Sequence, residues 1–243
     1  MTKHNFDINY HAKVVSRVVN GISNLFFVYC MIIMLALILF SSATLECTVV
    51  GESMIPTYNA DTHKGSDYVY VNKYVDDYQY SDIIVIDIGE TDPIIKRVIG
   101  LGGDVIDIVK LDKVGYRLEI NGEIIEEDYI EYKFYDTVDG RKVPLHLTEQ
   151  NGIYKSYEAF NTLRSTHSEL FVNGKLVVPE GHIFALGDNR HVSRDSTYYG
   201  TFASENILGV VESSRNADDS EFWFYVEYIL EGKFVYTIKN CLY

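Results

Sequence analysis

The sequence predicts a mainly β fold: an antiparallel β core that one N-terminal helix attaches to a membrane. A long uncharged apolar segment lies near the N-terminus, short runs of β-branched and aromatic residues follow it, and turn residues separate those runs. The chain of 243 residues holds 20 Tyr and 12 Phe but only 4 Pro, a composition that favours strands over helices. This length suits one sizeable domain or two small ones.

The apolar segment predicts a transmembrane anchor. No charged residue lies between Arg17 and Glu46, and residues 21–45 exceed the ~20 residues that a helix needs to cross the hydrocarbon layer. Residues 1–20 carry more basic than acidic side chains, so the positive-inside rule places them in the cytoplasm and the rest of the chain outside. A cleavable signal peptide is the alternative, because small residues at 41–43 offer a cleavage site.

The part of the chain that follows the apolar segment is predicted to form short strands. They are expected at 68–71, 83–86, 94–99, 105–109 and 117–120. The Asn121-Gly122 pair predicts a hairpin, and only 157–164 and the last twenty residues have helical periodicity. We expect one extracytoplasmic domain at 46–215 with a less strand-like cap inserted at 126–170, and a C-terminal segment, 216–243, that packs on the domain or at the membrane surface.

Charge and cysteine content exclude several classes of protein. The net charge of −14 argues against a nucleic-acid partner, since outside the first twenty residues only Arg141-Lys142 groups basic side chains. Three cysteines do not form a disulfide framework, although Cys47 and Cys241 could pair if the two ends of the domain meet. The seven histidines are scattered and no spacing is typical of a metal site, so we expect neither metal nor cofactor.

Two short segments carry the residues for catalysis, Ser53 in 51–57 and Lys96 in 96–100. A serine hydroxyl is a good nucleophile only when an adjacent base takes its proton. Lysine can be that base if burial lowers its pKa from about 10.4. In an extended strand Lys96 shares a face with Ile94 and Val98, whereas Arg97 lies on the other face. Taken alone, Lys96 would be interpreted as an ordinary strand lysine that reaches solvent, and it is the Ser53 segment that favours a catalytic role.

Four blocks in chain order resemble type I signal peptidases, the membrane-bound serine–lysine enzymes that remove signal peptides from exported preproteins. They are Ser-Met-x-Pro-Thr at 53–57, a hydrophobic strand ending in lysine at 67–73, Lys-Arg-Val-x-Gly-x-x-Gly-Asp at 96–104, and Gly-Asp-Asn-Arg-x-x-Ser-x-Asp-Ser at 187–196. The resemblance implies an endopeptidase in the cell membrane, with preproteins and membrane lipid as partners.

The resemblance also implies a role for individual residues. Ser53 would be the nucleophile and Lys96 its general base, with Ser193 hydrogen-bonded to the lysine amine. Asp188 and Arg97 would form a structural ion pair beneath the site. Asp195 matches a residue that usually pairs with a basic side chain two positions later. Thr197 stands there in this chain, so Arg190 or Arg194 would substitute, or the loop would be held differently.

Two glycines also depart from the family pattern. Gly102 stands where proline is common, which would loosen the turn after the catalytic strand. Gly51 stands where some members have a serine that supports the oxyanion hole. The Ser53 backbone N–H would then be the chief donor, and a second donor remains open.

An extended substrate would lie between the segment before Ser53 and the strand that carries Lys96, by β-strand addition. The expected substrate-binding residues are Val49, Val50, Met54, Ile94 and Ile95. Val49, Met54 and Ile95 would form shallow apolar pockets for small side chains at the first and third positions before the cut. Plain core packing is the alternative for each of them.

Other readings are weaker. Self-cleaving repressors share this chemistry but are soluble and carry a DNA-binding domain. A catalytically silent paralogue in assembly would usually lack one member of the Ser53–Lys96 pair. A histidine base, as in the eukaryotic-style enzymes, is disfavoured because position 96 is lysine. A specialised peptidase for pilin or surface-protein precursors stays open beside a general signal peptidase.

Overall fold

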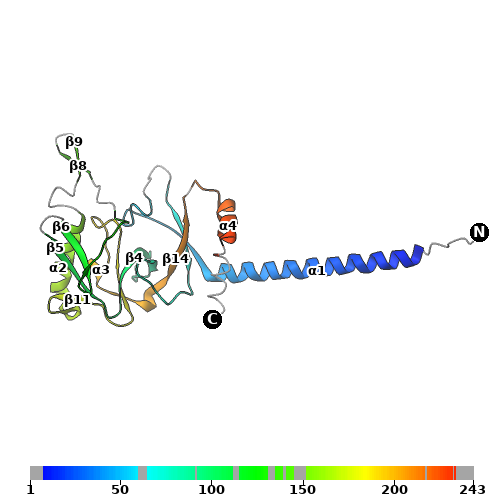
Figure 1. Ribbon diagram of the computed structural model, residues 1–243, viewed down its shortest axis with the longest axis horizontal. Coiled ribbons are helices and arrows are strands. Elements are labelled where there is room, and N and C mark those ends of the chain that lie inside the picture. Colours follow the sequence, from blue (N-terminus) through cyan, green and yellow to red (C-terminus); the bar gives the residue numbers. More distant parts are fainter. Residues whose placement is uncertain are drawn as a thin grey trace, which may run out of the picture.

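The computed structural model describes residues 8–59, 65–90, 92–111, 115–130, 135–138, 141–144, 152–216, 218–231 and 233. A single long helix, α1 (Ile8–Ala43), projects from a β domain that contains the rest of these residues (Figure 1). Its side chains are largely exposed, and Tyr10–Ala43 is long and apolar enough to cross a membrane. The predicted anchor is therefore a helix, and it lies outside the packed core.

The end of α1 leads directly into the first strand. The Thr44 hydroxyl donates to the Phe40 carbonyl at 2.9 Å, which satisfies one of the carbonyls that the end of a helix leaves free. Strand β1 (Thr44–Thr48) begins directly after Ala43, the last residue of α1, and pairs antiparallel with β2 (Tyr68–Asn72). Because no linker separates α1 from β1, the anchor is connected to the edge of the main sheet.

The main sheet has seven strands in the order β1-β2-β14-β3-β4-β12-β13, and every pairing is antiparallel. Beyond β1, its strands are β2 (Tyr68–Asn72), β3 (Ile83–Ile86), β4 (Ile94–Leu101), β12 (His182–Leu186), β13 (Phe202–Ala203) and β14 (Ile207–Arg215). Alternation places Val69 and Val71 of β2 in the core.

A second sheet has five strands in the order β10-β11-β5-β6-β7. They are β5 (Val105–Leu111), β6 (Gly115–Ile120), β7 (Glu123–Ile124), β10 (Phe171–Val172) and β11 (Lys175–Val177). Helix α2 (Gly152–Thr166) packs against this sheet through Phe160 and Leu163, which are three residues apart and so share one face. A separate hairpin joins β8 (Tyr135–Val138) to β9 (Arg141–Pro144).

Short helices complete the described chain. They are the 3-10 helices η2 (Ser168–Leu170) and η3 (Ser204–Asn206), α3 (Ser196–Tyr199) and α4 (Glu221–Leu230). Helix α4 lies beside the end of α1 that enters the β domain (Figure 1).

The mainly antiparallel β architecture is confirmed. The five strand segments expected from the sequence correspond to β2, β3, β4, β5 and β6. Asn121 and Gly122 have φ angles of 54° and 85°, the left-handed values that a tight two-residue hairpin turn requires. The helical segment predicted at 157–164 lies within α2.

Candidate active site

Ser53 and Lys96 meet in the structure although 43 positions separate them. Lys96 lies on β4, and Ser53 lies in the turn segment that follows β1. The Lys96 Nζ atom is 3.0 Å from Ser53 Oγ and 2.7 Å from the Ile95 carbonyl oxygen. Lys96 is only 2% exposed, so the amine is withdrawn from water.

Burial changes the acidity of this amine. It lowers the pKa of Lys96 to about 8, and the negative charges of Asp195 and Asp188 oppose part of that effect. An amine with this pKa is uncharged in a substantial fraction of molecules near pH 8. In that form it can accept a proton from the Ser53 hydroxyl, which an ordinary lysine cannot do at this pH.

The next residue, Arg97, forms a buried ion pair with Asp188. Its Nε and Nη2 atoms lie 2.8 Å and 2.6 Å from the two Asp188 carboxylate oxygens. The Thr57 hydroxyl also donates to Asp188, and the Arg97 guanidinium packs 4.1 Å from the centre of the Tyr129 ring. These contacts tie β4, the Ser53 segment and the 187–196 loop together.

Asp195 is held by its own loop. Its carboxylate accepts from the Gly187 N–H at 3.0 Å, from the Thr197 N–H at 3.0 Å and from the Thr197 hydroxyl at 2.8 Å. The Arg190 and Arg194 side chains are engaged elsewhere, Arg190 with Glu127 and Arg194 over the Tyr198 ring. Backbone donors and Thr197 therefore take the place of the basic partner.

The Arg190–Glu127 ion pair was not predicted from the sequence. Arg190 Nη1 donates to Glu127 Oε2 at 3.0 Å, a second contact joins Nη2 to Oε1, and Tyr129 donates to the same carboxylate at 2.7 Å. Both members of the pair are buried. Glu127 lies in the segment expected to form the cap, and no motif distinguishes it from its neighbour Glu126. The structure thus links the start of that segment to the 187–196 loop.

Ser193 does not make its expected contact. Its buried Oγ has no hydrogen-bond partner among the described residues, so the bond to the Lys96 amine is not formed. The loop remains close to the nucleophile, because the Asn189 N–H donates to the Ser53 carbonyl at 3.0 Å. Gly187 permits this approach: a Cβ there would lie 2.2 Å from Ser193 Oγ and 2.5 Å from the Ser53 carbonyl oxygen.

A cleft of about 470 Å³ opens above Ser53 and Lys96. The expected residues Val49, Val50, Ile94 and Ile95 line it. Met54 does not, because it is 1% exposed and packs with Val69, Val71 and Val85 in the core. Ser53 thus lines the cleft, whereas the side chain of Met54 lies in the core. The sequence did not indicate five further lining residues, Cys47, Thr48, Val85, Asp92 and Pro93.

Two glycines shape the borders of the site. Gly51 has a φ of +87°, a value that favours glycine, and Asn59 Nδ2 donates to its carbonyl at 3.0 Å. Asn59 also donates to the Val49 carbonyl at 2.9 Å and so holds the segment before Ser53. A Cβ at Gly102 would lie 3.1 Å from Glu180 Cα, so glycine allows close packing of this turn.

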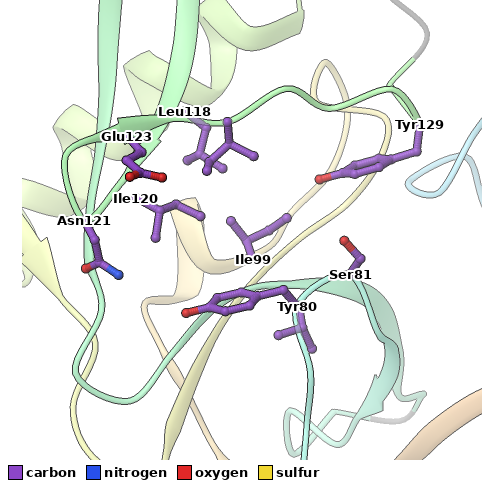
Figure 2. Close-up of a pocket in the computed structure, with 10 residues that line it drawn as sticks. Tyr80, Ser81, Ile99, Leu118, Ile120, Asn121, Glu123 and Tyr129 are labelled. Carbon is purple, nitrogen blue, oxygen red and sulfur yellow. The ribbon is translucent and has the colours of Figure 1, made fainter.

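A second cavity, of about 260 Å³, lies between the two sheets. Figure 2 shows Ile99 between Tyr80 and Tyr129 at this cavity, with Asn121 and Glu123 at its other end. Ser53 and Lys96 do not line it, so the cleft above them is the candidate active site. The described residues contain no group of three or more His, Cys, Asp and Glu side chains placed to hold a metal ion. Cys241, the possible partner of Cys47, lies outside the described residues.

Comparison with known proteins identifies the family. The model of the family described as signal peptidase, peptidase S26, matches residues 22–214. The chain belongs to this peptidase family. Signal peptidase I of Bacillus caldolyticus is 30% identical over 193 residues, which cover 77% of this chain and 85% of that protein. Signal peptidase I S of Bacillus subtilis strain 168 is 30% identical over 197 residues, 79% of this chain and 83% of that protein.

A solved structure also matches. The signal peptidase I of Enterococcus faecalis V583 is 28% identical, with a TM-score of 0.34, and the match covers 55% of this chain and 96% of that chain. The family match places this S26 peptidase among the hydrolases, and its apolar helix α1 fits single-pass membrane anchoring.

Proposed function

We propose that this peptidase removes N-terminal signal peptides from exported preproteins, with Ser53 as nucleophile and Lys96 as general base. The observation that carries this proposal is the buried Lys96 amine 3.0 Å from the Ser53 hydroxyl in an open cleft. The names of the relatives support the substrate class.

The uncharged Lys96 amine takes the Ser53 proton while Oγ attacks the scissile carbonyl carbon. The resulting oxyanion accepts hydrogen bonds from the Ser53 backbone N–H and from a second donor near Gly51. The C–N bond then breaks, and the protonated lysine gives its proton to the departing amine of the mature protein. Water attacks the acyl-enzyme with Lys96 again as base, which releases the signal peptide and restores Ser53.

The substrate would bind as an extended strand between 49–51 and β4. Val49, Val50, Ile94 and Ile95 form apolar walls in this cleft, whereas Met54 supports it from the core. Main-chain hydrogen bonds would provide affinity, and the shallow walls would favour small side chains before the cut. We assign the Arg97–Asp188 pair to positioning of β4, which carries Lys96, and Asp195 to holding the 187–196 loop, which carries Ser193.

For the arrangement in the membrane we propose residues 1–20 in the cytoplasm, 21–45 as the span and 46–215 as the extracytoplasmic peptidase domain, with 126–170 as its inserted cap. The charge difference across the apolar segment supports this orientation. We place 216–243 either on the domain or at the membrane surface. Preproteins and lipid are the partners we propose, without nucleic acid.

The experiment that tests the proposed mechanism compares Ser53→Ala and Lys96→Ala with the parent enzyme and with a surface variant, Val172→Ala. A purified preprotein in detergent is the substrate, and circular dichroism checks the fold. Both active-site variants should lose most of the processing rate, since each member of a catalytic unit is required, whereas Val172→Ala should match the parent. Processing at the parent rate by a folded Lys96→Ala enzyme would show that another group is the base.

A further inference from the structure

Helix α4 (Glu221–Leu230) has two apolar faces, and the domain covers only one of them. On the covered face Tyr228 is 3% exposed, and Phe224 stacks on Tyr70 with 4.4 Å between the ring centres. The other face carries what we call the α4 patch, whose members are 53–79% exposed: Trp223, Ile229 and Leu230. Large apolar side chains that are this exposed and lie together usually mark a surface that contacts another molecule or a membrane.

The patch lies beside the end of the membrane helix. The Phe40 ring, on the last turns of α1, makes edge contacts with Tyr225 and Tyr228 of α4 at centroid distances of 6.4 Å and 5.5 Å. Figure 1 shows α4 running across the direction of α1 at this end. A helix that crosses a transmembrane helix in this way lies along the plane of the bilayer.

The length of α1 gives the depth of this contact. If the hydrocarbon layer starts at Gly21, the first residue of the proposed span, then about 20 residues of helix extend to Phe40. Phe40 and the α4 residues against it would then lie where hydrocarbon meets the lipid head groups. Tryptophan favours this depth, because its ring is apolar and its N–H is polar.

We propose that α4 is an interfacial helix that inserts the α4 patch into the outer part of a phospholipid bilayer beside α1. A cavity between α1 and α4 supports this placement. It has a volume of about 490 Å³, and its lining is mostly apolar, with Leu37, Phe40, Tyr225 and Ile229, but also includes Glu46. This is a space for an acyl chain and the start of its polar head group. The family match ends at residue 214, so α4 lies beyond the matched region.

Charge indicates the type of lipid binding. The only charged residues of Glu221–Leu230 are Glu221 and Glu227, and Glu231 follows directly. These side chains would be repelled by anionic head groups. Apolar burial rather than electrostatic attraction therefore drives the contact, and it needs no anionic lipid.

The contact has a consequence for the cleft. Tyr70 of β2 packs on α4, while its neighbours Val69 and Val71 face the opposite side and pack with Met54, next to Ser53. Helix α1 is joined directly to β1, which pairs with β2. Both α1 and α4 thus connect the membrane to the β1–β2 edge of the main sheet. Together they would fix the orientation of the domain and the distance of Ser53 from the bilayer.

The chain has 1 tryptophan, Trp223, so its fluorescence reports directly on the patch. We would reconstitute the full chain in vesicles of phosphatidylcholine, with and without bromine on the acyl chains. Brominated lipid should quench the emission, and acrylamide in the water should quench it weakly, with no change on adding anionic lipid or salt. Emission unaffected by brominated lipid would overturn the proposal, since water, residues 234–243 or a second copy would then face the patch.

A matched pair of variants completes the test. Leu230→Glu changes the patch, and Val172→Glu places the same charge at an exposed apolar position on β10 of the second sheet. Leu230→Glu should weaken quenching by brominated lipid, whereas Val172→Glu should leave it unchanged. Equal quenching in both variants would overturn the interfacial placement, and this readout does not depend on the proposed catalytic function.

The consequence for Ser53 rests on the proposed function and has its own readout. Leu230→Glu should slow processing of a preprotein inserted in vesicles severalfold, yet leave cleavage of a soluble peptide in detergent at the parent rate. An equal loss in both assays would indicate a folding defect and overturn the positioning role. Unchanged processing in vesicles would overturn it as well.

Discussion

Two buried arginine–carboxylate pairs hold the 187–196 loop. They differ in the segment that each pair connects to this loop. Asp188 reaches from the loop to Arg97 on β4, the residue next to Lys96. Arg190 reaches from the loop to Glu127, at the start of the expected cap segment. In both pairs the side chains are at most 10% exposed.

The comparison shows that two ion pairs with similar burial can differ in their effect on the pKa of Lys96. The charge of Asp188 acts on Lys96 and partly opposes the lowering of its pKa by burial. Glu127 is not among the groups that shift the pKa of Lys96. We therefore expect both pairs to contribute to stability and only the Asp188 pair to change the pH dependence of catalysis.

The largest effect is expected from Glu127→Ala. It leaves the buried Arg190 guanidinium without its carboxylate, a change that typically costs about 3–5 kcal/mol of folding free energy. Urea unfolding of the full chain in detergent would measure the loss. Glu127→Ala combined with Arg190→Met should recover much of it, and a double variant as unstable as the single one would contradict this explanation.

Asp188→Asn should have a smaller effect on stability, since the amide oxygen can still accept from Arg97, and we expect a loss of about 1.5–3 kcal/mol. Its distinctive effect is on pH. In the parent, activity should rise with pH through the pKa of Lys96, about 8, because the uncharged amine is the base. Removal of the Asp188 charge lowers this pKa further, so the rise should move to lower pH.

The pH–rate profiles of Asp188→Asn and Glu127→Ala on a peptide substrate would separate the two pairs. The Glu127→Ala profile should keep the midpoint of the parent even where its rate is lower. Equal displacement of both profiles would mean that the shift reflects loosening of the loop and not the charge near Lys96.

The smallest effect is expected at a partly exposed pair that joins helix α2 to the second sheet. Arg164 Nη2 lies 3.2 Å from Asp107 Oδ1, with side-chain exposures of 34% and 18%. Pairs of this kind contribute about 0–1 kcal/mol, because water already solvates both charges. Asp107→Asn should therefore change the unfolding midpoint little and the pH–rate profile not at all. A loss as large as that of Glu127→Ala would show that burial does not distinguish these pairs.

Local sequence was sufficient for the membrane helix, for five of the strands and for choosing the proposed catalytic pair. The membrane helix follows from a charge-free apolar segment, and strands such as β3 and β4 follow from runs of β-branched residues. The hairpin at Asn121-Gly122 follows from the positive φ angles that these residues tolerate. Ser53 and Lys96 could be selected because their blocks are short, contiguous and resemble a known family.

Only the tertiary structure decided how distant segments meet. Glu127 and Arg190 are 63 positions apart, and neither the spacing nor the composition of either segment specifies the partner. Met54 turned out to support the cleft from the core, because a turn segment does not follow the alternation that predicts side-chain direction in a strand. The covered face of α4 was likewise fixed by the surfaces of β2 and α1. Local patterns determine which elements form, whereas long-range burial determines which of their side chains share a site.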